Sequence, residues 1–191
     1  AAINVDVKYL VTESNRITSK KSRVIASQQQ VVRYDHESTD EISIPSQKLI
    51  LDTFKKIINN YEIILISDYG KGVLSTELTQ SIINIANQHN KKVLIDPKGL
   101  DYLKYKGAYL LTPNIKEASD ATKIEIKDNE TLSKAITQLK LNCELEVSLV
   151  TLSEKGIAIY DNEFRIHPTT SKEIFDVTGA GDTVLASLGF S

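Results

Sequence analysis

Four short apolar runs, separated by segments with helical spacing, constrain the fold of this chain most strongly. The runs are EIILIS, KKVLID, AYLLT and VSLVTL, which begin at Glu62, Lys91, Ala108 and Val147. Short apolar runs of this kind are typical of strands that are buried on both faces. Strands that alternate with helices favour an α/β fold, in which a mainly parallel sheet carries helices on both faces.

The segments between these runs have the spacing of amphipathic helices. Residues 46–60 place Ile50, Phe54, Ile57 and Ile58 on one helical face. Residues 75–90 and 129–141 have a similar pattern, and Ser75 is a suitable N-cap. A short helix is expected at residues 115–119. The sequences GIAIYD and EFRIHP, at residues 156–161 and 163–168, predict a β-hairpin after the last buried strand.

The first part of the chain has a different pattern. The sequence RVIASQQQVVRYDHE, at residues 23–37, contains two apolar pairs that are separated by Gln and Ser. This pattern predicts exposed strands without a core of their own. We therefore expect a small β lid at residues 1–36 and an α/β core at residues 37–191, within one domain overall.

Composition limits the classes of function. The chain has 191 residues, of which 41% are hydrophobic and 25% charged, and its net charge is −2. This charge does not favour nucleic-acid binding, and no apolar run reaches membrane-spanning length. A single cysteine, Cys143, and no signal-peptide pattern favour a cytoplasmic protein. The chain has no Met, and its final glycine motif lies very near Ser191, so we expect an excerpt truncated at both ends.

The sequence FDVTGAGDTV, at residues 175–184, is open to more than one interpretation. An isolated G-x-G is often a tight turn before a helix. A dinucleotide fingerprint would need a third glycine where Val184 stands, and the chain has no Walker loop. The backbone N–H groups of Gly179, Ala180 and Gly181 at a helix start would suit an anion. Asp182 could then accept the proton of an attacking hydroxyl during phosphoryl transfer.

The sequence DVTGAGDT resembles the second signature of the ribokinase-like (PfkB) carbohydrate kinases, D-x-T-G-A-G-D, at every fixed position. The resemblance implies a ribokinase-like fold and a kinase that uses ATP with Mg²⁺. It also implies that Asp182 is the catalytic base and that Gly179, Ala180 and Gly181 form the anion hole.

Two further segments resemble nucleotide-site elements of that family. The sequence TPNIKEAS resembles the N-x-x-E element, which implies that Asn114 and Glu117 organise Mg²⁺, water and the nucleotide phosphates. No residue is expected to be a direct metal ligand, since Mg²⁺ would be held through this region and ATP. The alternative is a helix cap and a solvated acid in the first turn. The sequence LVTLSEKG resembles the strand and loop that contact the nucleotide, through Thr151, Ser153 and Gly156. The alternative there is an ordinary β-turn.

Three segments narrow the resemblance to one branch of the family. ISDYGKGVL, LIDPKGLDYLKYKGAYLLTPN and SRVIASQQQVVRYD resemble the kinase domain of bifunctional heptose kinase/adenylyltransferases. The implied reaction moves the ATP γ-phosphate to the anomeric hydroxyl of D-glycero-D-manno-heptose 7-phosphate, for ADP-heptose and lipopolysaccharide core synthesis. Another PfkB sugar kinase, of ribokinase or fructokinase type, and a non-catalytic module with this fold remain alternatives. The family's N-terminal sugar-binding segment, its C-terminal helices and the adenylyltransferase domain are absent from the sequence.

A phosphosugar substrate needs cations away from the reacting hydroxyl. The candidates are Arg33 and Lys71 for the substrate and Lys98 for phosphate at the nucleotide, while Arg23 is a weaker candidate. Asp68 could bind sugar hydroxyls or could cap the turn at Gly70–Gly72. Because an unpaired lid sheet exposes strand edges, and lids of this superfamily often pair between subunits, we expect a homodimer through the lid.

Overall fold

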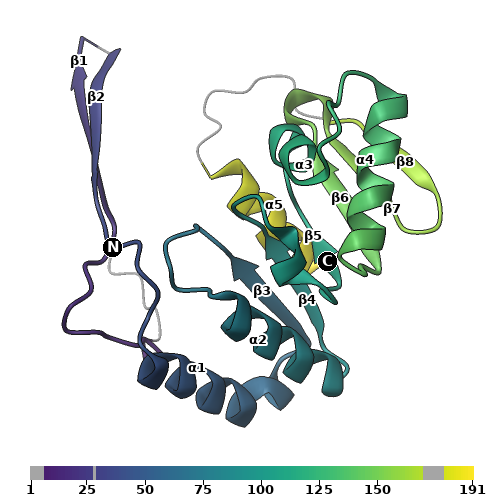
Figure 1. The fold of residues 1–191 in the computed structure, drawn as a ribbon. Helices are drawn as coiled ribbons and strands as arrows, with labels where there is room; N and C mark the ends of the chain where they lie inside the picture. Colours follow the sequence, from purple (N-terminus) through teal and green to yellow (C-terminus); the bar gives the residue numbers. More distant parts are fainter. Residues whose placement is uncertain (1–6, 28, 170–178) are drawn as a thin grey trace.

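The computed structural model describes residues 7–27, 29–169 and 179–191 (Figure 1). Within these residues a six-stranded sheet has the order β3-β4-β5-β6-β7-β8. Strands β3 to β6 are parallel, and β7 and β8 continue the sheet as an antiparallel hairpin. The mainly parallel sheet and the hairpin that the sequence predicts are therefore confirmed. The strands are β3 (Ile63–Ser67), β4 (Lys92–Asp96), β5 (Leu110–Leu111), β6 (Val147–Thr151), β7 (Ile157–Tyr160) and β8 (Phe164–His167).

Helices cover both faces of the sheet, but unequally in the part of the chain that the structure describes. Because side chains alternate along a strand, a strand contributes side chains to the cores on both faces of the sheet. Val93 and Ile95 of β4 belong to the larger core, beneath helices α1 to α4, whereas Leu94 packs with Leu185 of α5 on the other face. The helices are α1 (Ile44–Ile57), α2 (Thr76–Gln88), α3 (Ile115–Thr122), α4 (Asn129–Asn142) and α5 (Ala180–Phe190), with short 3₁₀ turns η1 (Ile58–Asn60), η2 (Tyr102–Tyr105) and η3 (Ser153–Lys155).

The helix starts follow from local capping. The Ser75 side chain accepts a hydrogen bond from the backbone N–H of Leu78, as the sequence predicts, and this satisfies a donor at the start of α2. Asn114 and Asp128 form capping boxes at the starts of α3 and α4. Helix α1 begins earlier than the apolar spacing suggests, because Ser43 is its N-cap and Pro45 lies in its first turn.

Strand β3 is less buried than its continuous apolar run suggests. It has a strand neighbour on one side only within the described residues, and the Leu65 side chain is 43% exposed. Strand β5 is also shorter than the run AYLLT, since only Leu110 and Leu111 pair as a strand. Apolar pattern alone cannot distinguish a central strand from an edge strand, because neighbours in the sheet come from elsewhere in the chain.

A separate two-stranded sheet precedes the core. Strands β1 (Lys20–Ala26) and β2 (Gln29–His36) pair with each other in antiparallel fashion, with an irregularity at Val24/Ile25. Figure 1 shows this hairpin projecting from the α/β layers. The exposed strands expected near the N-terminus are therefore present. The division of the chain into a lid and a core at residue 36 stays a prediction, because both parts include undescribed residues. Among the described residues no helix has the length and apolar character needed to cross a membrane.

A matched pair of substitutions in α4 tests the larger core. Ile136 is fully buried, whereas the Leu141 side chain on the same helix is 71% exposed. We expect Ile136→Ala to lower the free energy of unfolding by about 2–5 kcal/mol, because it leaves a cavity in a packed core. Leu141→Ala should change it by about 0.5 kcal/mol or less. Urea unfolding of both variants measures the difference, and equal losses would contradict this packing.

Candidate active site

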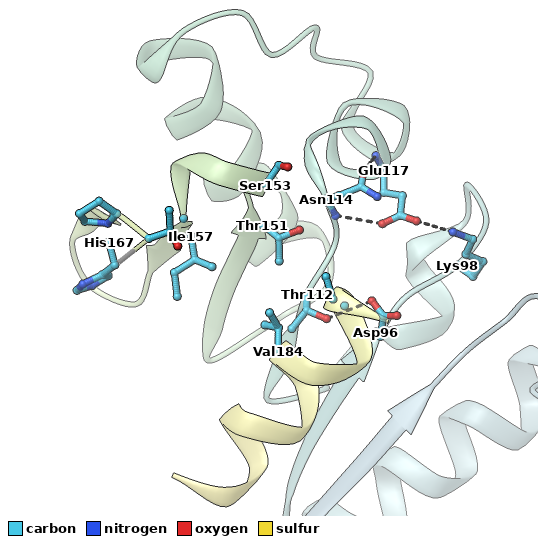
Figure 2. A pocket seen from close by; sticks show the side chains of 15 residues that line it. Asp96, Lys98, Thr112, Asn114, Glu117, Thr151, Ser153, Ile157, His167 and Val184 are labelled. Atoms are coloured by element: carbon cyan, nitrogen blue, oxygen red, sulfur yellow. Dashed lines mark hydrogen bonds and ion pairs between the residues drawn. The ribbon is translucent and has the colours of Figure 1, made fainter. Parts of the chain in front are cut away.

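The loops after the parallel strands meet at one edge of the sheet and enclose a cavity of about 730 Å³ (Figure 2). The volume lies within the range of small-molecule sites. Four parts of the chain line it: the end of β4 with its loop, the segment from β5 to α3, residues 151–169, and the first turns of α5. The predicted site residues that line it are Lys98, Asn114, Glu117, Thr151, Ser153, Gly156, Ala180 and Gly181.

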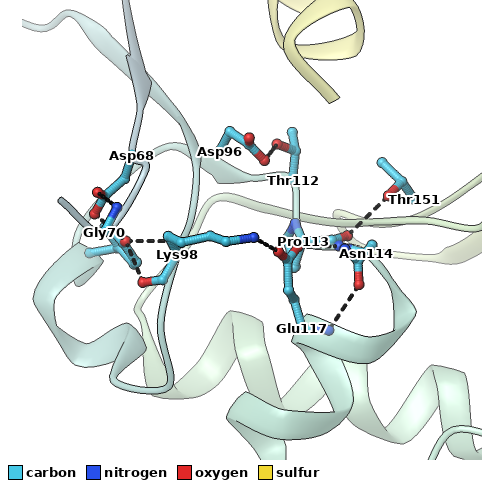
Figure 3. Close-up of polar contacts among 10 residues, drawn as sticks. Asp68, Gly70, Asp96, Lys98, Thr112, Pro113, Asn114, Glu117 and Thr151 are labelled. Carbon is cyan, nitrogen blue, oxygen red and sulfur yellow. Dashed lines mark hydrogen bonds and ion pairs between the residues drawn. The ribbon is translucent and has the colours of Figure 1, made fainter. Parts of the chain in front are cut away.

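Asn114 and Glu117 both cap α3 and line the cavity (Figure 3). The Asn114 side chain accepts a hydrogen bond from the backbone N–H of Glu117 at 2.9 Å, and a Glu117 carboxylate oxygen accepts one from the N–H of Asn114 at 3.0 Å. The other Glu117 oxygen lies 2.6 Å from the Lys98 ammonium. This hydrogen bond raises the pKa of Lys98. Asn114 and Glu117 therefore do cap α3, as the alternative interpretation predicts. The same hydrogen bonds also hold the Glu117 carboxylate at the cavity wall.

Asp96 is a site residue that the sequence reasoning missed. It ends β4, lines the same cavity and accepts a hydrogen bond from the Thr112 hydroxyl at 3.3 Å. Burial, followed by the nearby charge of Glu117, raises its pKa to about 6. A signal was available, because an acidic residue at the carboxyl end of a parallel strand lies where such sheets bind ligands.

The start of α5 forms another wall of the cavity. Gly179 has a left-handed conformation with φ of 77°, and no side chain caps the helix. The first-turn N–H groups have no side-chain acceptor among the described residues, and their binding of an anion stays a prediction. A Cβ atom added to Gly181 would lie 3.7 Å from an Asp96 carboxylate oxygen, so this turn passes beside Asp96. The motif residues Asp176 to Thr178 lie outside the described residues.

Asp182 contacts the end of β3. One of its carboxylate oxygens accepts a hydrogen bond from the Ser67 hydroxyl and the other accepts one from the Tyr69 hydroxyl, both at 3.1 Å. Its neighbour Gly181 lines the 730 Å³ cavity, whereas Tyr69 lines a second cavity of about 640 Å³. Asp182 itself lines neither cavity, but it contacts a lining residue of one and follows a lining residue of the other.

The contacts of Asp68 correspond to the turn-capping alternative. Its carboxylate is 3% exposed, accepts a hydrogen bond from the backbone N–H of Gly70 at 2.7 Å, and contacts the Lys104 ammonium at 2.6 Å and the Tyr105 hydroxyl at 2.7 Å. Strand alternation explains this placement, because Asp68 points to the face of the sheet that carries the larger core. A contact between Asp68 and a sugar hydroxyl would require these partners to be displaced.

Lys71 and Arg33 are not part of the 730 Å³ cavity. Lys71 lines the second cavity and pairs with Glu37. Arg33 lies on the hairpin, where its guanidinium forks onto Asp35 with distances of 2.9 and 2.6 Å and lowers the pKa of that carboxyl. Arg33 lines neither of these two cavities. Their contact with a substrate phosphate stays a prediction.

The arrangement of sheet, glycine turn and Asp182 agrees with a comparison of the sequence with known families. Residues 1–189 match the pfkB family of carbohydrate kinases, and the chain belongs to that family.

Two relatives make the likeness more particular. The chain is 59% identical to "Bifunctional protein HldE" of Aliarcobacter butzleri (strain RM4018) and 55% identical to the protein of the same name of Sulfurimonas denitrificans (strain ATCC 33889 / DSM 1251), over 189 residues each. Each alignment covers 99% of this chain but only 40% of the relative. The structure of Arabidopsis thaliana ribokinase complexed with ribose and ATP superposes with a TM-score of 0.65 at 18% sequence identity. The superposition covers 88% of this chain and 54% of the ribokinase chain. The ribokinase-like fold is thereby confirmed.

The raised pKa of Asp96 predicts a dependence of stability on pH. The folded protein keeps this proton up to about pH 6, whereas an ordinary aspartate loses it near 3.8. Between these values the folded state binds more protons than the unfolded state, so the free energy of unfolding falls as pH rises. Asp96→Asn removes the titrating group and with it this loss of stability. Because the site is partly solvated, we expect the free energy of unfolding of the variant, relative to that of the original protein, to rise by about 1 kcal/mol between pH 4 and 7.5.

Urea unfolding in metal-free buffer at several pH values measures this gain. Asp52→Asn in α1 serves as the control, since Asp52 does not line this cavity. A constant difference between the Asp96→Asn variant and the original protein across this pH range would contradict the prediction.

Proposed function

We propose that this chain is the kinase part of a bifunctional heptose enzyme. It transfers the γ-phosphate of ATP to the anomeric hydroxyl of D-glycero-D-manno-heptose 7-phosphate, a step toward ADP-heptose and the lipopolysaccharide core. The names of the two relatives and their identity across nearly the whole chain support this assignment, although the chain spans 40% of their length. The observation that carries the proposal is the position of Asp182 in the first turn of α5, where it contacts Tyr69 of one cavity and follows Gly181 of the other.

ATP would occupy the 730 Å³ cavity. The first-turn N–H groups of α5 would face the transferring phosphoryl group, where a helix start stabilises negative charge. Lys98, whose side chain is about half exposed and pairs with Glu117, would contribute a positive charge. Thr151, Ser153 and Gly156 would contact the rest of the nucleotide from the β6 side of the cavity.

The residues present suit a magnesium ion. Asp96 and Glu117 bring carboxylate oxygens to one cavity, and the charge of Glu117 contributes, after burial, to the raised pKa of Asp96. A cation would balance the charge of these two carboxylates. No group of three or more potential metal-ligating side chains occurs among the described residues. Mg²⁺ would therefore be held by phosphate oxygens and water together with the Asn114–Glu117 region, and when bound it would neutralise phosphate charge.

The phosphosugar would occupy the 640 Å³ cavity. Basic side chains from three segments line it, namely Arg16, Lys21 and Lys71, and they suit a substrate that already carries a phosphate. Arg33 would join them only if the hairpin approached the core. The attacking sugar oxygen forms a bond to the γ-phosphorus, the bond from that phosphorus to ADP breaks, and Asp182 accepts the hydroxyl proton.

The two alternatives have weaker support. A ribokinase or fructokinase type would share Asp182 and the glycine turn, so only substrate preference separates it from a heptose kinase. A non-catalytic module would have no need for a carboxylate held beside an open helix start. A cytoplasmic location belongs to the proposal, and a single, buried, free cysteine is consistent with it.

A substrate panel tests the assignment. The full-length polypeptide that contains this chain, supplied with ATP and Mg²⁺, should have a kcat/KM for D-glycero-D-manno-heptose 7-phosphate at least about 100-fold above that for ribose or fructose 6-phosphate. Release of ADP in a coupled assay measures each rate. Equal rates for the three sugars would refute the heptose assignment while leaving a sugar kinase.

The base role of Asp182 has a separate test. Asp182→Asn should lower kcat by about 10²–10⁴-fold, because the variant cannot accept the hydroxyl proton. The dissociation constant of ATP, measured by calorimetry, should stay within about twofold, since Asp182 does not line the nucleotide cavity. Asp120→Asn, an exposed carboxylate change in α3, is the control. Unchanged turnover in Asp182→Asn would remove Asp182 from this role.

We also propose a homodimer through the hairpin. The apolar side chains Val24, Ile25, Val31, Val32 and Tyr34 are all more than half exposed, and Val24 and Val32 are cross-strand partners on one face. Exposed apolar surface on a short sheet with open edges suits pairing with a second copy. Val32→Lys should convert a dimer to a monomer in sedimentation velocity, and Leu141→Lys in α4 should not. A monomeric original protein would contradict the proposal.

A further inference from the structure

We propose that Ser67 and Tyr69 are positioning residues that hold the Asp182 carboxylate in the orientation needed for proton transfer. This inference rests on the proposed role of Asp182 as the base. The two hydroxyls lie at the end of β3 and reach the two different oxygens of the same carboxylate, each at 3.1 Å.

Strand alternation explains why these two side chains reach α5. Ser67, Asp68 and Tyr69 follow one another at the end of β3, and successive side chains point to opposite faces. Asp68 is held on the face of the larger core by Tyr105 and Lys104. Ser67 and Tyr69 are therefore directed to the other face, where α5 lies. Asp68 therefore caps the turn after β3 on one face of the sheet, whereas Ser67 and Tyr69 contact α5 on the other.

Close packing at the far end of α5 brings the carboxylate to these hydroxyls. A Cβ atom added to Gly189 would come within 2.8 Å of the Leu65 side chain, so the backbone of α5 packs directly against that side chain of β3. Asp182 precedes Gly189 by about two helical turns and so lies on the same face of α5. Leu65, Ser67 and Tyr69 likewise share one face of the strand. The strand and helix therefore meet along matching faces.

The hydroxyl pair suits a general base better than a charged partner would. Each carboxylate oxygen has two lone pairs, so one remains on each oxygen for the substrate proton. Two donors on different oxygens restrict rotation of the carboxylate, whereas one donor would leave it free to turn. The hydrogen bond to Asp182 is also the main reason that the pKa of Tyr69 is raised, so this hydroxyl remains a donor.

Tyr69 also connects the base to the acceptor side. It lines the 640 Å³ cavity and is 54% exposed, so a sugar in that cavity would contact its ring beside the carboxylate. A role in sugar binding alone predicts a change in the KM of the sugar. A positioning role predicts a change in kcat, because the orientation of the base affects proton transfer more than binding.

Steady-state kinetics of the full-length protein separate these roles. Tyr69→Phe should lower kcat by about tenfold, and Ser67→Ala by a similar factor, with the KM of ATP within about twofold of the original. Ser67→Thr keeps a hydroxyl and should retain most of the turnover. Tyr61→Phe, an exposed tyrosine just before β3, is the control and should have no effect. An unchanged kcat with a raised sugar KM in Tyr69→Phe would overturn the proposal, as would a Ser67→Thr enzyme as slow as Ser67→Ala.

A spectroscopic measurement decides the geometry without turnover. The side-chain carboxyl ¹³C resonance of Asp182, assigned by its loss in Asp182→Asn, should shift in Tyr69→Phe and in Ser67→Ala but not in Tyr61→Phe. Its constancy in all three variants would overturn the proposal. If the original protein phosphorylates none of the panel sugars, the proposed function fails, and this resonance still shows whether the two hydroxyls hold the carboxylate.

Discussion

The packing of α5 against strands β3 and β4 is the interaction on which the candidate site depends. Leu185 joins Leu94 in the smaller core, and Gly189 lies directly against Leu65. These contacts place the first turn of α5 beside Asp96 and bring Asp182 to the end of β3. Without this docking, the glycine turn would be an ordinary helix start, and the carboxylate would have no fixed orientation.

Charge balance is the second organising feature of the site. Glu117 lies close enough to Asp96 for its charge to contribute to the raised pKa of that carboxyl, and Lys98 pairs with Glu117 while its side chain remains about half exposed. A cavity with two acidic groups, a half-exposed lysine and the first turn of a helix is suited to phosphates that arrive with a divalent cation. The neighbouring cavity is lined by three basic residues, Arg16, Lys21 and Lys71, together with Glu13 and Glu37, and the basic residues are the basis of the proposed phosphosugar site. Asp182 lies between Gly181, which lines the first cavity, and Tyr69, which lines the second.

Much of this organisation was predictable, and the errors have physical causes. The apolar runs and Ser75 correctly indicated the parallel strands and the start of α2, because periodicity and capping are local properties. Asp96 was missed, since its importance arises from Thr112, Glu117 and the start of α5, which come from other parts of the chain. Asp68 was open to two interpretations for the same reason, as its partners Lys104 and Tyr105 lie well downstream.

The sequence by itself determined the alternation of strands and helices, the glycine turn with Asp182 behind it, and membership in the PfkB family. These are properties of local pattern and of residues at fixed spacing. Only the tertiary structure decided that β3 is an edge strand among the described residues, that Asp68 is buried, and that Ser67 and Tyr69 contact Asp182. Those facts depend on which face of β3 each side chain occupies and on which element covers that face. Residues more than one hundred positions apart, such as Ser67 and Asp182, meet only when the sheet and α5 have packed together.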